Sequence, residues 1–227
     1  NLSFKRFPYA LISATLGTFV ILFLINKSNN LNQELISILN KTAMVLFLGV
    51  PLFLCVHSIF DRKRDIRLIY RYSIQATAIV SLLLYYHFLL NEINMVSISR
   101  YIAVSLASYL FFIIIPYLNK KKNFELYVIK IFTRLFITSI YSLVLYIGLA
   151  ATLFTLNKLL NLPVSGELYS STAILVLGIF APFFMLAEIP HPNKIIKTDE
   201  YPDVLKILIL YIIMPLISVY TVILYLY

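Results

Sequence analysis

The stretch "TAMVLFLGVPLFLCVHSIFDRKR", residues 42–64, runs from Thr42 to Phe60 without aspartate, glutamate, lysine or arginine. It then ends in Asp61 and the basic residues 62–64. At ~1.5 Å per residue, a helix over this run matches the roughly 30 Å hydrocarbon core of a bilayer. The run is continuously apolar, whereas a lipid-facing strand alternates apolar and polar positions. It therefore predicts a transmembrane helix that ends at a charged membrane surface.

The composition of the whole chain gives the same class. Hydrophobic residues make up 61% of the 227 residues, and charged residues only 13%. The mean hydropathy is +0.89, and a typical soluble domain has about 25% charged residues. A soluble fold of this length could not hide so much apolar surface. The single cysteine, Cys55, excludes an intramolecular disulfide.

Seven apolar runs are long enough to cross a bilayer. They predict an all-α, polytopic integral membrane helical bundle that forms a single transmembrane domain over residues 1–227, with spans at about 9–25, 42–60, 73–90, 98–118, 135–156, 169–189 and 204–227. The chain begins with Asn1 and ends inside an apolar run. We therefore expect it to be a fragment of a longer polypeptide.

Two helices should extend beyond their spans. No proline occurs over residues 124–160, so one helix is expected to include a lead-in before the fifth span. The stretch "LNQELISILNKTA", residues 31–43, is amphipathic and predicts a lead-in to the second span. Two pairs of small residues at four-residue spacing predict helix-packing faces: Ser13 with Gly17, and Ala103 with Ala107.

Lysine and arginine indicate the orientation, because they accumulate on the cytoplasmic side of a membrane. Seven spans with a cytoplasmic N-terminus place fifteen of the nineteen basic residues inside. Only four lie outside: Lys27, Lys41, Arg100 and Lys158. The sequence therefore predicts that the N-terminus is cytoplasmic.

The inner basic clusters also account for the net charge of +9. We interpret them as topology signals that contact anionic lipid headgroups, with about 1 kcal/mol of attraction for each basic residue near the surface. A specific lipid or phospholigand pocket is the alternative, and no nucleic-acid partner is expected. The predicted headgroup contacts are Arg62, Lys63, Arg64, Arg67, Lys120, Lys121 and Lys122.

Ionisable residues at membrane depth are candidates for function. His57 and Asp61 share a helical face at i and i+4, which permits an imidazole–carboxylate pair, and His87 lies near the outer end of the third span. Glu188 and His191 are three residues apart in "AEIPHPNK", residues 187–194. The flanking prolines disfavour one helix through both, so we interpret the stretch as a helix exit rather than a metal site. There Glu188 needs a basic partner, and no metal or cofactor is expected.

Prolines inside three spans predict bent helices. Pro51, Pro182 and Pro215 each remove a backbone donor, and neighbouring groups must satisfy the freed carbonyls. Broken helices near mid-membrane often form the substrate sites of transporters. This triplet is the best support in the sequence for transport.

Several stretches resemble one known family: "FKRFPYALISATLGT" at residues 4–18, "FLGVPLFLCVHSIFDRKR" at 47–64, "YSLVLYIGLAATLFTLNKLLNLPVSGELY" at 141–169, "GIFAPFFMLAEIP" at 178–190 and "YPDVLKILILYIIMPLISVYTVILYLY" at 201–227. Together they look like the bacterial multi-pass membrane family named domain of unknown function 4153. The resemblance implies a helical fold, a bacterial plasma membrane and further helices or a soluble part after residue 227. It implies no catalytic residue.

Three functions stay open at this level. The first is a component of a transporter or of a larger membrane assembly. The second is a sensor or scaffold whose activity lies in a missing C-terminal part. The third is a membrane-embedded enzyme acting on lipid-linked substrates, which ranks lower because no HExxH, paired-aspartate or GxSxG pattern occurs.

The orientation can be tested by cysteine labelling. A Lys121→Cys variant should resist a membrane-impermeant thiol reagent added to intact cells, because residue 121 is expected in the cytoplasm. A Lys158→Cys variant, on the opposite side, should be labelled. Labelling of residue 121 from outside would overturn the predicted topology.

Overall fold

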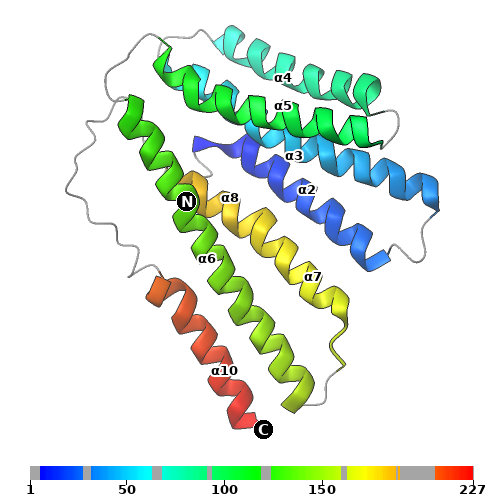
Figure 1. Ribbon diagram of the computed structural model, residues 1–227, viewed down its shortest axis with the longest axis vertical. Coiled ribbons are helices and arrows are strands. Elements are labelled where there is room, and N and C mark those ends of the chain that lie inside the picture. The colour runs from blue at the N-terminus through cyan, green and yellow to red at the C-terminus, as the bar shows by residue number, and fades with distance from the viewer. Residues whose placement is uncertain are drawn as a thin grey trace.

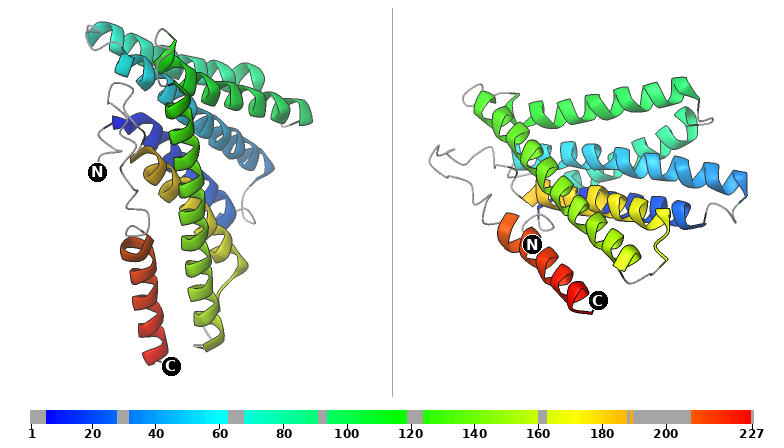
Figure 2. Two further views of the ribbon diagram at one scale, coloured as in Figure 1. Left: turned by 60° about the vertical axis from the view of Figure 1, so that its left-hand side comes forward. Right: turned by 60° about the horizontal axis from the view of Figure 1, so that its bottom comes forward.

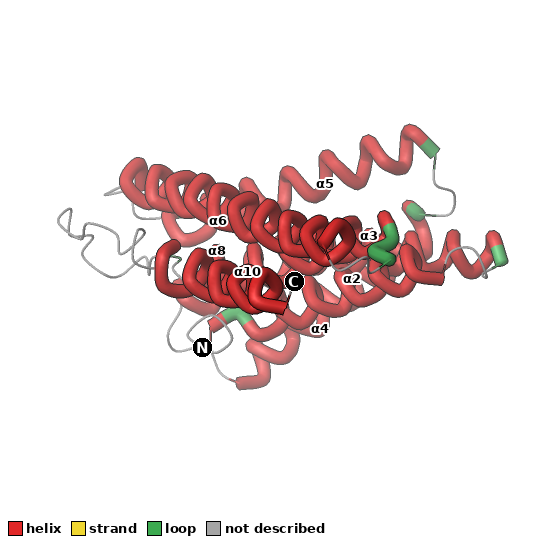
Figure 3. Tube along the Cα trace, turned by 90° about the horizontal axis from the view of Figure 1, so that it is seen from below, coloured by secondary structure: helices red, strands yellow, loops and turns green. Residues whose placement is uncertain are grey.

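The computed structural model describes residues 6–27, 32–62, 68–90, 94–118, 124–159, 163–187, 189 and 208–226. The described residues form helices with a few loop residues at their ends, and they contain no strand (Figure 3). The all-α prediction is confirmed.

Each predicted run corresponds to one helical segment. The elements are α2 (Pro8–Lys27), α3 (Gln33–Arg62), α4 (Leu68–Leu89), α5 (Met95–Ile114) with the 3₁₀ turn η2 (Ile115–Tyr117), α6 (Phe124–Leu159), α7 (Gly166–Leu175), the π-helical η3 (Val176–Phe180), α8 (Ala181–Ala187), the π-helical η4 (Leu208–Ile213) and α10 (Met214–Leu226). The expected lead-ins are confirmed, because α3 begins at Gln33 and α6 at Phe124.

Five of the described helices are long and apolar enough to cross a membrane by length and composition. They are Pro8–Lys27, Gln33–Phe60, Met95–Tyr117, Phe124–Leu159 and Gly166–Ala187. A shorter apolar helix covers Tyr211–Tyr225, and α4 has 22 residues. The chain is thus a multi-pass helical membrane protein, while the count of seven spans and the cytoplasmic N-terminus stay predictions.

α2 lies at the centre of the bundle, and the other helices are arranged on two sides of it (Figures 1 and 2). One side of α2 packs against α3, which in turn contacts α4 and α5. Another side of α2 packs against α7, η3 and α8, and these contact α6. The outermost contact joins α6 to η4 and α10. Successive long helices run in opposite directions, so α2, α4 and α6 begin at one end of the bundle, which we call the Arg6 end. The opposite end is the Lys27 end (Figure 1).

Small residues allow α2 to approach both of its neighbours. A Cβ atom added at Gly49 of α3 would lie 2.5 Å from Ser13 Oγ, and one added at Gly178 of η3 would lie 2.1 Å from Thr18 Oγ1. Ser13 Oγ also donates a hydrogen bond to the Leu46 carbonyl. In a bilayer such close packing and interhelical hydrogen bonds hold helices together. The packing face predicted at Ser13 and Gly17 is confirmed, since both are buried.

The second predicted pair is wrong. Ala103 and Ala107 are both exposed on α5. The face of α5 that packs carries Ser108 and Phe112 instead, and the Ser108 carbonyl accepts a hydrogen bond from the Cys55 thiol of α3 at 3.1 Å. Four-residue spacing of alanines fits a packing face and a lipid face equally well, because alanine is tolerated in both environments.

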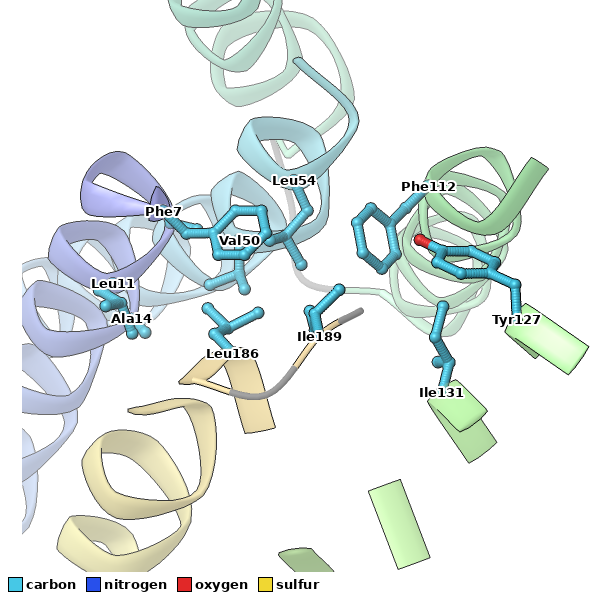
Figure 4. Close-up of a cluster of buried hydrophobic side chains, with 11 residues drawn as sticks. Phe7, Leu11, Ala14, Val50, Leu54, Phe112, Tyr127, Ile131, Leu186 and Ile189 are labelled. Atoms are coloured by element: carbon cyan, nitrogen blue, oxygen red, sulfur yellow. The ribbon is translucent and has the colours of Figure 1, made fainter. Parts of the chain in front are cut away.

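A buried apolar cluster ties five helices together near the Arg6 end (Figure 4). α2 contributes Ala10, Leu11 and Ala14, Phe7 lies directly before α2, and α6 contributes Tyr127 and Ile131. The remaining members come from α3, α5, α8 and the second residue after α8: Val50, Leu54, Phe112, Leu186 and Ile189. This cluster sets the positions of the polar groups described below.

The close approach at Gly178 predicts a stability effect. Gly178→Ala should lower the free energy of unfolding by about 1–3 kcal/mol, because overpacking forces a shift of Thr18. Thr18 is fully buried, and its hydroxyl bonds the Ala14 carbonyl at 2.7 Å, so its side chain cannot easily turn away. Thermal unfolding in detergent would measure the change.

Two further variants control this experiment. Gly166→Ala should leave stability unchanged or slightly higher, since no atom lies within 4 Å of the added Cβ. Adding Thr18→Ala to Gly178→Ala should recover part of the loss. A Gly178→Ala protein as stable as Gly166→Ala would contradict the described contact.

Candidate functional site

Several sequence-predicted residues lie outside the part of the chain that the structure describes. Glu188 is one of them, so its predicted basic partner stays a prediction. The side chains of Asp61 and Arg62 also lie outside, as do Lys63, Arg64, Arg67, Lys120, Lys121 and Lys122. The His57–Asp61 pair and the headgroup contacts therefore stay predictions too.

His57 belongs to a group of contacting side chains at the Arg6 end. Its imidazole lies edge-on to the Phe7 ring, with ring centroids 4.5 Å apart. The Arg6 guanidinium lies 4.8 Å from the centroid of the same Phe7 ring. Arg6, Phe7 and His57 thus form one group in which a cation, a buried ring and an imidazole are in contact.

Arg6 also reaches the backbone beyond α8. Its Nη1 donates a hydrogen bond to the carbonyl of Ile189, two residues after the last residue of α8. A hydrogen bond from a charged donor to a backbone carbonyl is stronger than one between neutral groups. Arg6 therefore fastens the start of α2 to the end of α8. This contact of Arg6 was not predicted from the sequence, although "KRFP" precedes the first span.

His87 lies apart from this group. It is exposed on α4, with its ring 5.2 Å from the Phe88 ring and almost perpendicular to it. α4 runs away from the Arg6 end, and His87 falls in its last turn. The structure therefore does not bring the two intramembrane histidines together.

The three prolines lie in two different backbone environments. Pro51 is fully buried inside α3, which continues as a helix through it. Pro182 follows the π-helical η3 by two residues, and Pro215 follows the π-helical η4 by two residues. In a π turn the N–H of residue i donates a hydrogen bond to the carbonyl of residue i−5. In η3 the Ala181 N–H donates in this way to the Val176 carbonyl. Such single π turns are frequent at functional sites.

Between these two π-helical segments lies a face of α6 that carries hydroxyl groups. From Thr138 to the end of the helix, every buried residue of α6 has a hydroxyl: Thr138, Tyr141, Ser142, Thr152 and Thr155. The Tyr141 ring contacts the Phe184 ring of α8 at 4.9 Å. Two turns farther along the same side of α6, a Cβ added at Gly148 would lie 2.3 Å from Leu216 Cδ1 of α10. We call this surface the hydroxyl face.

The hydroxyls of this face differ in their hydrogen bonding. Thr152 and Thr155 donate to carbonyls four residues earlier in α6, each at 2.9 Å. Thr138 Oγ1, Ser142 Oγ and Ser171 Oγ of α7 are buried without a hydrogen-bond partner among the described residues. A buried polar group without a partner is costly, and more so in a membrane. These three hydroxyls can therefore bond water or a polar solute at low cost.

One cation adjoins the hydroxyl face. Arg134 lies one helical turn before Thr138 on the same side of α6, half-buried, and interacts electrostatically with Tyr141. Arg134 precedes the predicted fifth span, so it places a positive charge at the end of the hydroxyl face nearer the Arg6 end. No group of three metal-ligating side chains occurs among the described residues.

The comparison with known families agrees with this architecture. The model of the family described as "Domain of unknown function (DUF4153)" matches residues 8–227. The chain belongs to this family. The match covers every element from α2 to α10, so the resemblance inferred from the sequence is confirmed. Nothing among curated proteins and nothing among solved structures matches the chain.

For this DUF4153 chain, the Arg6 contact predicts a measurable loss of stability. Arg6→Ala should lower the free energy of unfolding by about 1.5–3 kcal/mol, as expected when a hydrogen bond from a charged group is lost. Arg6→Lys should lie in between, because it keeps the charge but loses the planar stack on Phe7. Lys158→Ala, at an exposed position of α6, serves as the control and should be neutral. Equal stabilities for Arg6→Ala and Lys158→Ala would show that Arg6 does not hold α2 to α8.

Proposed function

We propose that this chain is the membrane component of a transporter, in which the hydroxyl face of α6 lines the route of a polar solute or a proton. The observation that carries the proposal is that all five buried residues in the second part of α6 bear hydroxyls. Serine and threonine at a packing face in lipid are expected to hydrogen-bond a neighbouring helix or their own backbone, whereas Thr138 Oγ1 and Ser142 Oγ are buried without a partner among the described residues.

The dimensions of the face suit this role. Thr138 and Thr155 are 17 positions apart, which is ~26 Å along a helix and close to the roughly 30 Å hydrocarbon core. Thr138 and Ser142 form the part nearer the Arg6 end, and Thr152 and Thr155 the part nearer the Lys27 end. Polar side chains therefore occur along most of the membrane depth.

The neighbours of the hydroxyl face suit it as well. α7–α8 and η4–α10 contact α6, and each contains a π-helical segment followed by a proline. Such interruptions leave backbone carbonyls without their usual partners, and in transporters they border the substrate route. The proposal extends to a bacterial plasma membrane, a cytoplasmic N-terminus and further protein partners within a larger assembly.

Cysteine accessibility would test the proposal. In a Cys55→Ser background, Ser142→Cys and Thr152→Cys should react with a water-soluble, positively charged thiol reagent about tenfold faster than lipid-facing controls, because the thiolate is the reactive form and needs a polar environment. Matched controls on the same helix are Leu143→Cys and Phe154→Cys, which are 60% and 58% exposed. Each control is within two residues of its test position.

The result separates transport from packing. Reaction at both test positions and not at the controls supports a water-filled route. Equally slow reaction at all four positions would contradict transport and leave the hydroxyl face as a helix-packing surface.

A further inference from the structure

A groove opens between α2, α3 and α5 in the half of the bundle nearer the Lys27 end. Its cavity volume of about 630 Å³ lies within the roughly 300–1,000 Å³ typical of small-molecule sites. The last two turns of α2, the middle of α3 and the first turns of α5 line it. Its lining residues are Ile21, Leu24, Ile25, Asn40, Ala43, Met44, Phe47, Ile98, Tyr101 and Ile102.

The groove is apolar except at two places. Eight of the ten lining residues have hydrocarbon or thioether side chains, and the other two are Asn40 and Tyr101. Asn40 is the lining residue of α3 nearest the Lys27 end, and Phe47 is the one farthest from it. A bound molecule therefore meets the Asn40 amide at one end of the groove. Farther along α3 it contacts only apolar side chains.

The register of α2 and α3 gives the depth of Asn40. Ser13 contacts Leu46 and Gly49, and Gly17 contacts Phe47 and Leu46, so the two helices run antiparallel. Continued along both helices, this register places Asn40 beside residues 19–24, roughly one to two turns before α2 ends at Lys27. With its 20 residues, α2 is long enough to span the core, so Asn40 lies in the part of the core nearer the polar region at the Lys27 end.

The length of the groove argues against a protein helix as occupant. Asn40 and Phe47 are seven positions apart, which corresponds to ~10 Å along α3. A transmembrane partner helix would need a face of about 30 Å. The groove is open to the surroundings on the α5 side, where Ile98 is 38% and Ile102 59% exposed. A flexible chain can therefore enter it sideways from the membrane.

We propose that this groove binds one acyl chain of a diacyl phospholipid, with the ester group of that chain at the Asn40 amide. An ester carbonyl accepts a hydrogen bond from the amide N–H groups, and the methylene groups continue along Ala43, Met44 and Phe47. Because the methylenes come from hydrocarbon and not from water, the hydrogen bond of the ester to Asn40 and the van der Waals packing along the groove distinguish a bound lipid from the bulk bilayer. The binding is noncovalent and needs no co-reactant.

Native mass spectrometry of the detergent-purified chain would test this proposal. The wild-type chain should carry one phospholipid when dioleoyl phosphatidylcholine is added. Ala43→Phe fills the groove and should reduce the lipid-bound fraction about tenfold, which equals ~1.4 kcal/mol of binding free energy. The matched control is Ala76→Phe on the exposed face of α4, which should bind like the wild type. Equal lipid binding by Ala43→Phe and Ala76→Phe would overturn the proposal.

A second measurement does not depend on the folding of Ala43→Phe. The chain contains no tryptophan, so Phe47→Trp provides a single fluorescent reporter in the groove. In vesicles of phosphatidylcholine with brominated acyl chains, its quenching should reach a plateau at a low fraction of brominated lipid. A reporter at Phe154, 58% exposed on α6, should be quenched in proportion to that fraction. Proportional quenching at both positions would mean that only bulk lipid contacts residue 47, and would refute the site.

Discussion

The approach of α2 to two neighbours at once is the constraint on which the rest of the structure depends. No hydrophobic force draws helices together in lipid, so close packing and interhelical hydrogen bonds must do so. Gly49 and Gly178 provide the space, and Ser13 and Thr18 fill it. Because α2 is fixed between α3 and η3, Phe7 reaches His57, Arg6 reaches the end of α8, and the Lys27 end of α2 borders the groove.

The helices themselves could be predicted from the sequence, because helix formation depends on local features. These are the long apolar runs and the lack of proline over residues 124–160. The continuous α6 and the early start of α3 are examples. The π-helical segments could not be predicted, because they are a shift in backbone hydrogen bonding that hydropathy does not encode. Proline indicated where the two interruptions lie, although the sequence did not distinguish Pro182 and Pro215 from Pro51.

The candidate site was harder to predict than the fold. Sequence reasoning concentrated on ionisable residues, and the structure brings His57 to Phe7 and Arg6 but leaves His87 exposed. The hydroxyl face was missed, because serine and threonine barely lower the hydropathy of a span. A signal was present, since all five hydroxyl residues of the face fall on one side of a helix with 3.6 residues per turn: Thr138, Tyr141, Ser142, Thr152 and Thr155.

The uninterrupted α6 has a mechanical consequence. Its 36 residues form a rod of ~54 Å, longer than the bilayer core, with no proline or π turn at which to flex. The segments beside it, α7–α8 and η4–α10, each contain a weakened turn near a proline. Deformation of the bundle is therefore concentrated in those two segments. A displacement applied at Phe124 would be carried along the whole length of such a rigid helix to its other end at Leu159.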